Sequence, residues 1–125
     1  MKVLDASVVI AFLDGEDAHH GDAVHSLETC AEDGLAINVV TLAEILVGPM
    51  RARRDAQVMR ELAGIGIQVV GIPVDAGQRL AELRLRTGLR MPDCCVLLAA
   101  QQVSGDVLTF DQRLAASARD VLGMP

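Results

Sequence analysis

Four carboxylate residues stand where apolar segments of the sequence meet segments with helical spacing. These residues are Asp5, Glu44, Asp93 and Asp111. Asp5 follows the apolar pair Val3-Leu4, and Asp111 follows a second apolar run that ends at Thr109. If both runs are strands of one parallel sheet, their carboxyl ends lie at the edge where open α/β sheets bind ligands. We therefore expect the four acids to gather at that edge.

A cluster of four carboxylates is repulsive unless a cation lies among them. Hard cations such as Mg²⁺ or Mn²⁺ take oxygen ligands and keep several waters. Ions held in this way can activate water and stabilise the leaving oxygen in phosphodiester cleavage. No His, Cys or Lys recurs at these junctions, which argues against a zinc site or covalent catalysis.

Each acid also has a purely structural interpretation. Asp5 and Asp111 could cap the helices that follow them. Glu44 lies three residues after Thr41, the spacing of a capping box. Asp93 suits the first turn of a helix, where the helix dipole favours an acid. The argument for a functional site therefore rests on the four acids jointly.

Short buried runs alternate with amphipathic segments along the chain. The runs predict strands at residues 2–5, 35–40, 67–72 and around 107–109. The intervening segments predict helices at residues 7–13, 21–33, 41–47, 51–62, 75–86, 95–103 and from 114 onward. We expect Pro49 to break or kink the third helix. This alternation predicts a three-layer α/β/α sandwich around a mainly parallel sheet.

The composition excludes several classes of protein. The 125 residues suit one domain, residues 1–125, and 51% of them are hydrophobic, so disorder is not expected. No apolar run approaches the roughly 18 residues of a membrane span. The N-terminus lacks the cleavage site of a signal peptide, so we expect a cytoplasmic protein without membrane association. The three cysteines have no metal-type spacing and are expected to be reduced and buried.

The net charge of −6 is distributed unevenly. Residues 1–50 hold nine acids and one lysine, whereas residues 51–125 hold eight acids and ten arginines. Arg51, Arg53 and Arg54 form the densest basic run, and Arg90 lies in the loop before Asp93. Arginine binds phosphate well, although exposed helical arginines are the simpler alternative. Three histidines lie around the loop before the second helix, where we expect solvated side chains: His19, His20 and His25.

The order and spacing of the motifs resemble those of a PIN domain, and more specifically of the toxin subunit of a VapBC-type toxin–antitoxin pair. The motifs are Asp5-Ala6-Ser7, Thr41-Leu42-Ala43-Glu44, Pro92-Asp93 and Thr109-Phe110-Asp111. No single one is specific, but four in this order over essentially the whole chain form a strong signal.

This resemblance implies a Mg²⁺- or Mn²⁺-dependent endoribonuclease that hydrolyses RNA, with a PIN-like sheet of four to five strands. It also implies a homodimer and a small VapB-like antitoxin whose C-terminal segment covers the active site. The residues that match the family's acidic quartet are Asp5, Glu44, Asp93 and Asp111, and those that match its supporting hydroxyls are Ser7 and Thr109. The basic candidates for RNA or partner contact are Arg51, Arg53, Arg54 and Arg90.

The sequence also departs from the family pattern. Arg113 stands where members often carry a further acid, so the metal site is expected to hold fewer ions or one weakly. The helix after Asp93 begins with Cys94-Cys95, where small residues are usual. The chain ends at Met124-Pro125, about where the family's fifth strand would begin.

Other functions fit less well. A phospho-receiver domain needs a lysine near its last strand, but Lys2 is the only lysine. A haloacid-dehalogenase-like phosphatase needs a second acid at the position of Ser7. Two alternatives are left open: a PIN-domain nuclease of RNA maturation without an antitoxin, and a non-catalytic α/β interaction module in which the acids only cap helices.

Overall fold

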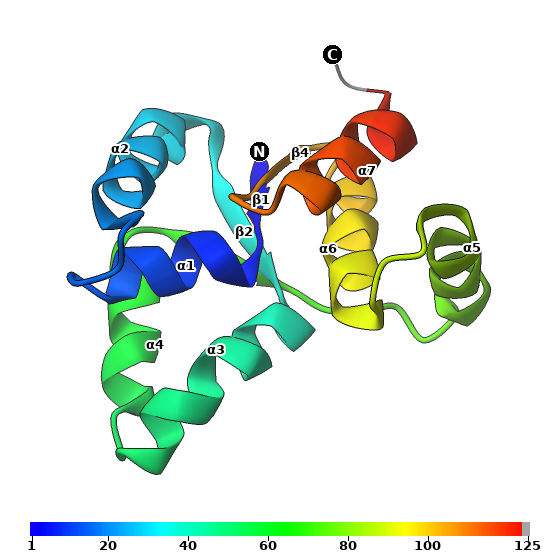
Figure 1. The fold of residues 1–125 in the computed structure, drawn as a ribbon. Helices are drawn as coiled ribbons and strands as arrows, with labels where there is room; N and C mark the ends of the chain where they lie inside the picture. Colours follow the sequence, from blue (N-terminus) through cyan, green and yellow to red (C-terminus); the bar gives the residue numbers. More distant parts are fainter. Residues whose placement is uncertain (124–125) are drawn as a thin grey trace.

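The computed structural model describes residues 1–123, which form a short parallel sheet and flanking helices (Figure 1). The strands are β1 (Lys2–Leu4), β2 (Leu35–Asn38), β3 (Ile67–Val70) and β4 (Asp106–Leu108). The α-helices are α1 (Ala6–Leu13), α2 (His20–Cys30), α3 (Val39–Arg51), α4 (Asp55–Gly64), α5 (Gly77–Thr87), α6 (Met91–Gln102) and α7 (Gln112–Leu122). A 3₁₀ turn, η1 (Ala31–Asp33), follows α2.

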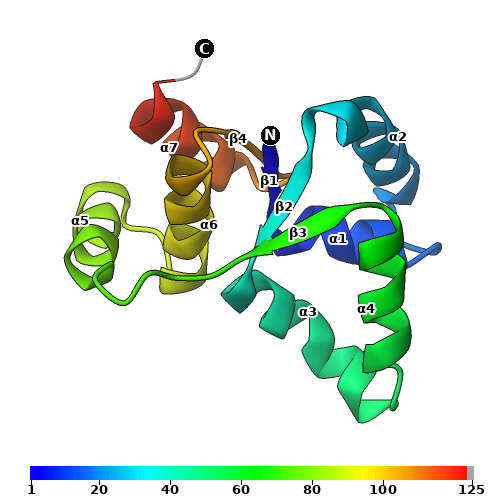
Figure 2. The same cartoon turned by 180° about the vertical axis from the view of Figure 1, so that it is seen from behind.

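All four strands are parallel, in the order β3-β2-β1-β4. Leu4 of β1 lies opposite Ile37 of β2 and Leu108 of β4. The chain adds strands on one side of β1, and after β3 it crosses to the α5 side and returns as β4 on the other side of β1 (Figure 2). This reversal creates a topological switch point between β1 and β4, where open α/β sheets bind their ligands.

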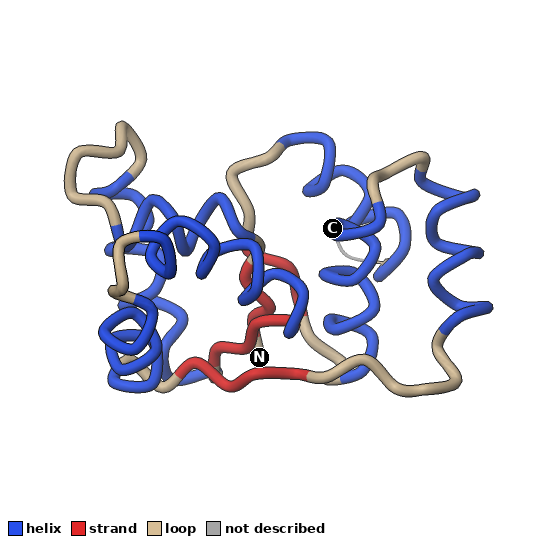
Figure 3. The backbone as a smooth tube through the Cα atoms, turned by 90° about the horizontal axis from the view of Figure 1, so that it is seen from below, coloured by secondary structure: helices blue, strands red, loops and turns tan. Residues whose placement is uncertain are grey.

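The sheet separates two hydrophobic cores, as the predicted three-layer sandwich requires. Leu4 and Ile37 face the core under α1 to α4, whereas Val3 and Ala36 face the core under α5 to α7. Successive strand residues point to opposite faces, which gives this alternation. The strands accordingly lie between two groups of helices when the molecule is seen from below (Figure 3). The predicted fold class is confirmed.

Helix α6 has the longest buried run of the described helices. Every residue from Cys94 to Ala100 is buried, so the helix has no polar stripe there. The prediction that the cysteines are buried holds for Cys94 and Cys95, whose pKa values are raised chiefly by burial, whereas Cys30 is only partly buried. Because α6 is held on all sides, the acid in its first turn has a fixed backbone position.

The start of α3 differs from the sequence prediction. Strand β2 ends at Asn38 rather than Val40, and the Asn38 side chain caps α3 by accepting a hydrogen bond from the Val40 N–H at 2.8 Å. Thr41 therefore lies inside the helix and does not form a capping box with Glu44. Val39 and Val40, the apolar β-branched pair after Asn38, are compatible with either a strand or a helix. The Asn38 cap favours the helix.

The break expected at Pro49 does not occur there. Helix α3 continues through Pro49 to Arg51, and α4 begins only at Asp55. Pro49 lies in the last turn of α3, so only one hydrogen bond is missing and the helix ends two residues later. Arg53 and Arg54 consequently lie in the turn between the two helices, not on a helix as predicted.

Two further expectations concern the ends of the fold and membrane association. The described residues form four strands, and Met124-Pro125, about where the family's fifth strand would begin, lie outside them. Among residues 1–123, no helix has the length and apolar character needed to cross a bilayer.

Gly105 controls how closely β4 approaches β1. The Met1 carbonyl accepts a hydrogen bond from the Asp106 N–H at 3.0 Å, and a methyl group at position 105 would overlap that carbonyl oxygen. We expect Gly105→Ala to lower the free energy of unfolding by about 1–3 kcal/mol, as overpacking does. Urea denaturation measures this value.

The matched control is Gly48→Ala, because position 48 lies in α3 with open space around it. Alanine there should be neutral or stabilising by up to about 1 kcal/mol, since it favours helix more than glycine does. Equal effects of the two substitutions would contradict the close approach at Gly105.

Candidate active site

The Asp5 carboxylate is buried at the carboxyl end of β1 and is held by two hydroxyl groups. Its side chain is 6% exposed. One oxygen accepts a hydrogen bond from Ser7 Oγ at 2.6 Å and from the Val8 N–H at 3.4 Å, and the other accepts one from Thr109 Oγ1 at 2.6 Å. No basic side chain of residues 1–123 forms an ion pair with it. Asp5 is thus a buried carboxylate with neutral donors only.

The same two hydroxyls fix the loop that follows β4. Thr109 Oγ1 accepts a hydrogen bond from the Asp111 N–H at 2.9 Å, and Ser7 Oγ accepts one from the Phe110 N–H at 3.2 Å. Each hydroxyl therefore donates to Asp5 and accepts from the loop. This pairing ties the backbone of Asp111 to the Asp5 carboxylate.

Asp111 is exposed and caps α7. Its carboxylate accepts hydrogen bonds from the N–H groups of Arg113 at 2.9 Å and Leu114 at 3.1 Å. The capping interpretation made from the sequence is correct in this respect. One carboxylate oxygen takes both bonds, so the other oxygen is free of these contacts.

Asp93 lies close to Asp5 and Asp111 across the site. It is half-buried in the first turn of α6. Burial raises the pKa of the Asp93 carboxyl, and the charges of Asp111 and Asp5 raise it further, against the opposing charges of Arg90 and Arg113. The structure therefore brings three of the four acids into one electrostatic unit.

Glu44 lies within electrostatic range of α6. It is exposed on α3, and its charge adds to the elevation of the pKa of Cys95, two residues beyond Asp93. It makes no hydrogen bond to the other three acids within the described chain. Glu44 thus borders the site without joining its hydrogen-bond network.

Helix N-termini converge on these acids. Helix α1 begins directly after Asp5, α7 begins directly after Asp111, and Asp93 lies in the first turn of α6. The N-terminal end of a helix carries a partial positive charge and free N–H groups. These ends offset part of the repulsion among the acids and favour the approach of a phosphate group.

Asn38 is a site residue that the sequence analysis missed. It follows Ile37, which pairs with Leu4, so it lies opposite Asp5 at the carboxyl edge. Its side chain is fully buried, and its amide nitrogen has no hydrogen-bond partner among residues 1–123; the same is true of the buried Thr41 hydroxyl. An asparagine between a buried strand and a helix is an N-cap signal that could have found it.

The donor chemistry of the site fits a hydrated divalent cation. In the part of the chain described, no three His, Cys, Asp or Glu side chains form a ready ligand cluster. However, Asp5 is a buried carboxylate without a basic partner among the same residues. Burial, together with the charges of Asp111 and Asp5, raises the pKa of Asp93. Mg²⁺ keeps several of its waters and needs only one or two carboxylates, so the residues fit an ion held partly through water.

The model of the PIN domain family matches residues 2–120 of the chain. The chain belongs to the PIN domain family. Of the structures with a similar fold, VapC20 from Mycobacterium tuberculosis, a sarcin–ricin loop cleaving toxin, has a TM-score of 0.77 and 17% identity, covering 94% of this chain and 95% of that one. No curated protein sequence matches the chain.

Two further neighbours of similar fold come from complexes. A toxin–antitoxin complex from Klebsiella pneumoniae has a TM-score of 0.69 and 21% identity, covering 89% of this chain and 87% of its own. VapBC2 from Rickettsia felis, bound to a DNA fragment from its promoter, has a TM-score of 0.68 and 15% identity, covering 88% and 87%. At these identities the likeness shows a shared fold.

The basic candidates of this PIN domain lie in two places. Arg90 directly precedes α6 and its charge acts on Asp93, so it borders the acids. Arg51, Arg53 and Arg54 lie at the tip of the α3–α4 hairpin (Figure 1), about 18 Å along α3 from its start. The structure therefore brings Arg90 to the site and leaves the other three remote from it.

One sizeable hollow of the PIN domain lies away from the acids. It measures about 670 Å³ and lies at the amino edge of the sheet, beside the Lys2–Asp106 ion pair. A second hollow of about 440 Å³ includes Thr109 and Asp111 in its lining. Because the carboxylates, hydroxyls and helix ends converge at the carboxyl edge, chemistry rather than volume locates the site there.

The raised pKa of Asp93 predicts a pH-dependent stability in metal-free protein. The folded state holds the Asp93 proton more tightly than the unfolded state does. The resulting contribution to the stability of the fold is fully present below the ordinary pKa of 3.8 and is lost as the pH rises through the higher pKa of the folded state. Asp93→Asn should therefore raise the unfolding temperature at pH 7 in EDTA, with a smaller gain near pH 3.

The control is Asp75→Asn, an exposed acid in the loop before α5, which should change little at either pH. Calorimetric scans at the two pH values supply the comparison. If Asp93→Asn instead melts at a lower temperature than the unsubstituted protein at pH 7, the ionised Asp93 carboxylate does not destabilise the metal-free fold.

Proposed function

We propose that this PIN domain is a metal-dependent endoribonuclease and the toxin of a type II toxin–antitoxin pair. The observation that carries the proposal is the buried Asp5 carboxylate, which two hydroxyls hold at a switch point of the sheet. Its charge and that of Asp111 add to the effect of burial in raising the pKa of Asp93. The toxin folds among its neighbours support the same assignment. A nuclease of RNA maturation would share the site but would need no antitoxin.

Each residue of the site has a distinct role in this proposal. Asp5, Asp93 and Asp111 would hold Mg²⁺ or Mn²⁺ directly or through water, with Glu44 binding the ion or orienting the attacking water. When bound, the ion supplies Lewis acidity and lowers the pKa of a coordinated water. Ser7 and Thr109 restrict Asp5 to one orientation, because each of its oxygens accepts a hydroxyl proton.

The charge around the acids suits an anionic substrate. Arg90 stands beside Asp93, and the N-termini of α1, α6 and α7 point at the same place. These groups would bind the oxygens of the scissile phosphate, whose negative charge would otherwise be repelled by the carboxylates. Positioning and charge neutralisation are the contributions that phosphodiester cleavage needs from a protein.

An apolar surface on the helices supports a protein partner. A hollow of about 200 Å³ lies between α1, α3 and α4, with Leu13, Ile45 and Val58 in its lining and Arg54 and Glu61 beside them. Ile10, which is 46% exposed, also lines it. A small VapB-like antitoxin would cover this surface, and a homodimer would bring two such domains together.

Replacing Asp5 tests the proposed reaction. Asp5→Asn should reduce cleavage of a mixed tRNA and rRNA pool, in Mg²⁺ or Mn²⁺, to the level of an EDTA control. Asparagine still caps a helix well, so α1 should persist, and circular dichroism checks the fold. Asp75→Asn, an exposed acid away from the site, should cleave like the unsubstituted protein.

The result distinguishes the proposed function from its alternative. Activity retained in Asp5→Asn would refute the assignment of the site. An unsubstituted domain that neither cleaves RNA nor binds Mn²⁺ would show that the acids serve only as caps and that the domain acts by binding.

The remote arginines test the nature of the partner surface. Because Arg51, Arg53 and Arg54 lie at the tip of the α3–α4 hairpin, changing all three to Ala should weaken antitoxin binding more than RNA cleavage. Calorimetric titration of the antitoxin and the RNA cleavage assay report the two effects. If both stay intact, these arginines have neither role.

A further inference from the structure

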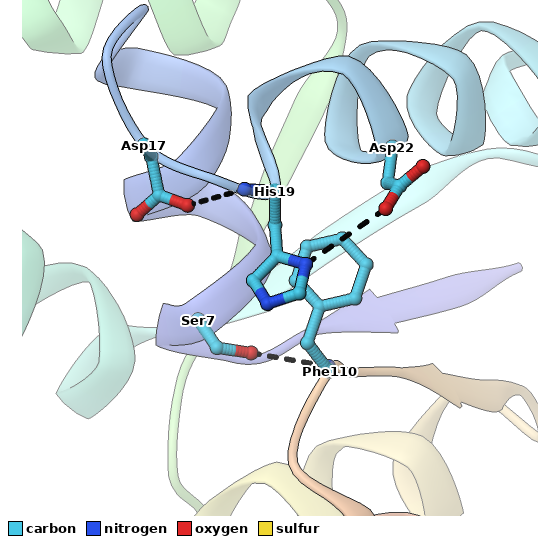
Figure 4. Close-up of polar contacts among 5 residues, drawn as sticks. All are labelled: Ser7, Asp17, His19, Asp22 and Phe110. Carbon is cyan, nitrogen blue, oxygen red and sulfur yellow. Dashed lines mark hydrogen bonds and ion pairs between the residues drawn. The ribbon is translucent and has the colours of Figure 1, made fainter.

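An aromatic pair stands beside the proposed active site. The imidazole of His19 stacks on the ring of Phe110, with centroids 5.0 Å apart and an interplanar angle of 28° (Figure 4). The chain has no Trp or Tyr and only two Phe, so one of its two large aromatic rings lies next to the acids. His19 lies in the loop before α2 and is exposed, as expected, but its ring also contacts Phe110.

Hydrogen bonds and packing against the core hold both members of the pair in place. The Phe110 N–H donates to Ser7 Oγ, which in turn donates to Asp5, and the Phe110 ring packs on the core under α1 to α4. The His19 N–H donates to Asp17 at 2.8 Å, and its imidazole lies 3.8 Å from the Asp22 carboxylate (Figure 4). The His19–Phe110 pair is thus connected through Ser7 to Asp5, the buried carboxylate of the candidate site.

The outer face of His19 is open. Its side chain is 60% exposed even though one face lies on Phe110. The imidazole and Phe110 border the hollow of about 440 Å³, whose lining also includes Thr109 and Asp111. This volume falls in the range of small-molecule sites, and the hollow shares two residues with the proposed reaction centre.

Helix α7 forms the other wall of the hollow. Asp111, Ala115 and Arg119 recur at intervals of four residues along the face that lines it. Arg119 lies about 12 Å along the helix from Asp111 and forms no ion pair within residues 1–123. A free guanidinium at that distance suits the phosphate of a neighbouring nucleotide.

We propose that His19, supported by Phe110, forms a subsite that stacks one unpaired base of the RNA next to the scissile phosphate, with Arg119 at the adjoining phosphate. This inference rests on the proposed function and specifies how its substrate is held. Sequence-tolerant recognition of single-stranded RNA depends on stacking of bases on aromatic side chains. His19 supplies such a face, and Phe110 and Ser7 connect it to Asp5.

Nucleotide binding tests the subsite without using activity. The chain has three histidines, so their ring C–H signals can be assigned by NMR from single substitutions. Titration with AMP in EDTA should shift the His19 signals upfield and saturably, while the His25 signals stay in place. Ribose 5-phosphate should not reproduce the shift, and Phe110→Leu should weaken it. Equal shifts with ribose 5-phosphate, or none with AMP, would overturn the proposal.

Cleavage kinetics on a single-stranded RNA oligonucleotide test its role in the reaction. His19→Ala should raise KM about tenfold with little change in kcat, the size of effect caused by losing one stacking side chain. His19→Phe should retain a low KM because it keeps the ring, which a purely structural loss would not explain. His25→Ala, an exposed histidine of α2 outside the hollow, serves as the control.

An abasic scan identifies the base that is bound. Removing the stacked base should raise the KM of the unsubstituted protein as much as His19→Ala does. It should not raise the KM of the His19→Ala variant any further. Cleavage with an unchanged KM in His19→Ala would refute the subsite while leaving the nuclease proposal intact. AMP binding at His19 in a protein that cleaves no RNA would refute the nuclease proposal instead.

Discussion

The burial of the Asp5 carboxylate constrains the rest of the structure. An ionised carboxylate is costly to bury unless its oxygens accept hydrogen bonds. Here one hydroxyl donor, Ser7, lies in α1, and the other, Thr109, follows β4 and is 104 positions from Asp5 in the sequence. The parallel pairing of β1 with β4 brings these segments together. The fold and the arrangement of the site therefore have a common origin.

The electrostatics of the site reflect a balance between repulsion and fixed positive groups. Burial raises the pKa of Asp93, and the charges of Asp111 and Asp5 raise it further. Helix N-termini, Arg90 and Arg113 act in the opposite direction. Arg113 also donates to the Gly88 carbonyl at 3.1 Å, which holds the loop before α6 against α7. At this position an arginine reduces the negative charge where family members often add to it.

Much of this arrangement could be predicted from the sequence because it depends on local patterns. Apolar runs followed by an acid located β1 and β4, and their parallel pairing was enough to bring Asp5 near Asp111. The start of α3 was missed because Val39 and Val40 suit a strand as well as a helix. The contact between His19 and Phe110 could not be predicted, since it joins two loops 91 positions apart in the sequence that meet only in the folded chain.

The pairing of β1 with β4 has a consequence for the order in which the protein is made. The first strand emerges from the ribosome early, but its neighbour on one side begins only at Asp106. A nascent chain that ends before this residue contains Asp5 without Thr109 and without Asp111. The hydrogen bond from Thr109 to Asp5 spans 104 positions of the sequence. During synthesis the site therefore stays incomplete until β4 and the loop that follows it have been added and have paired with β1.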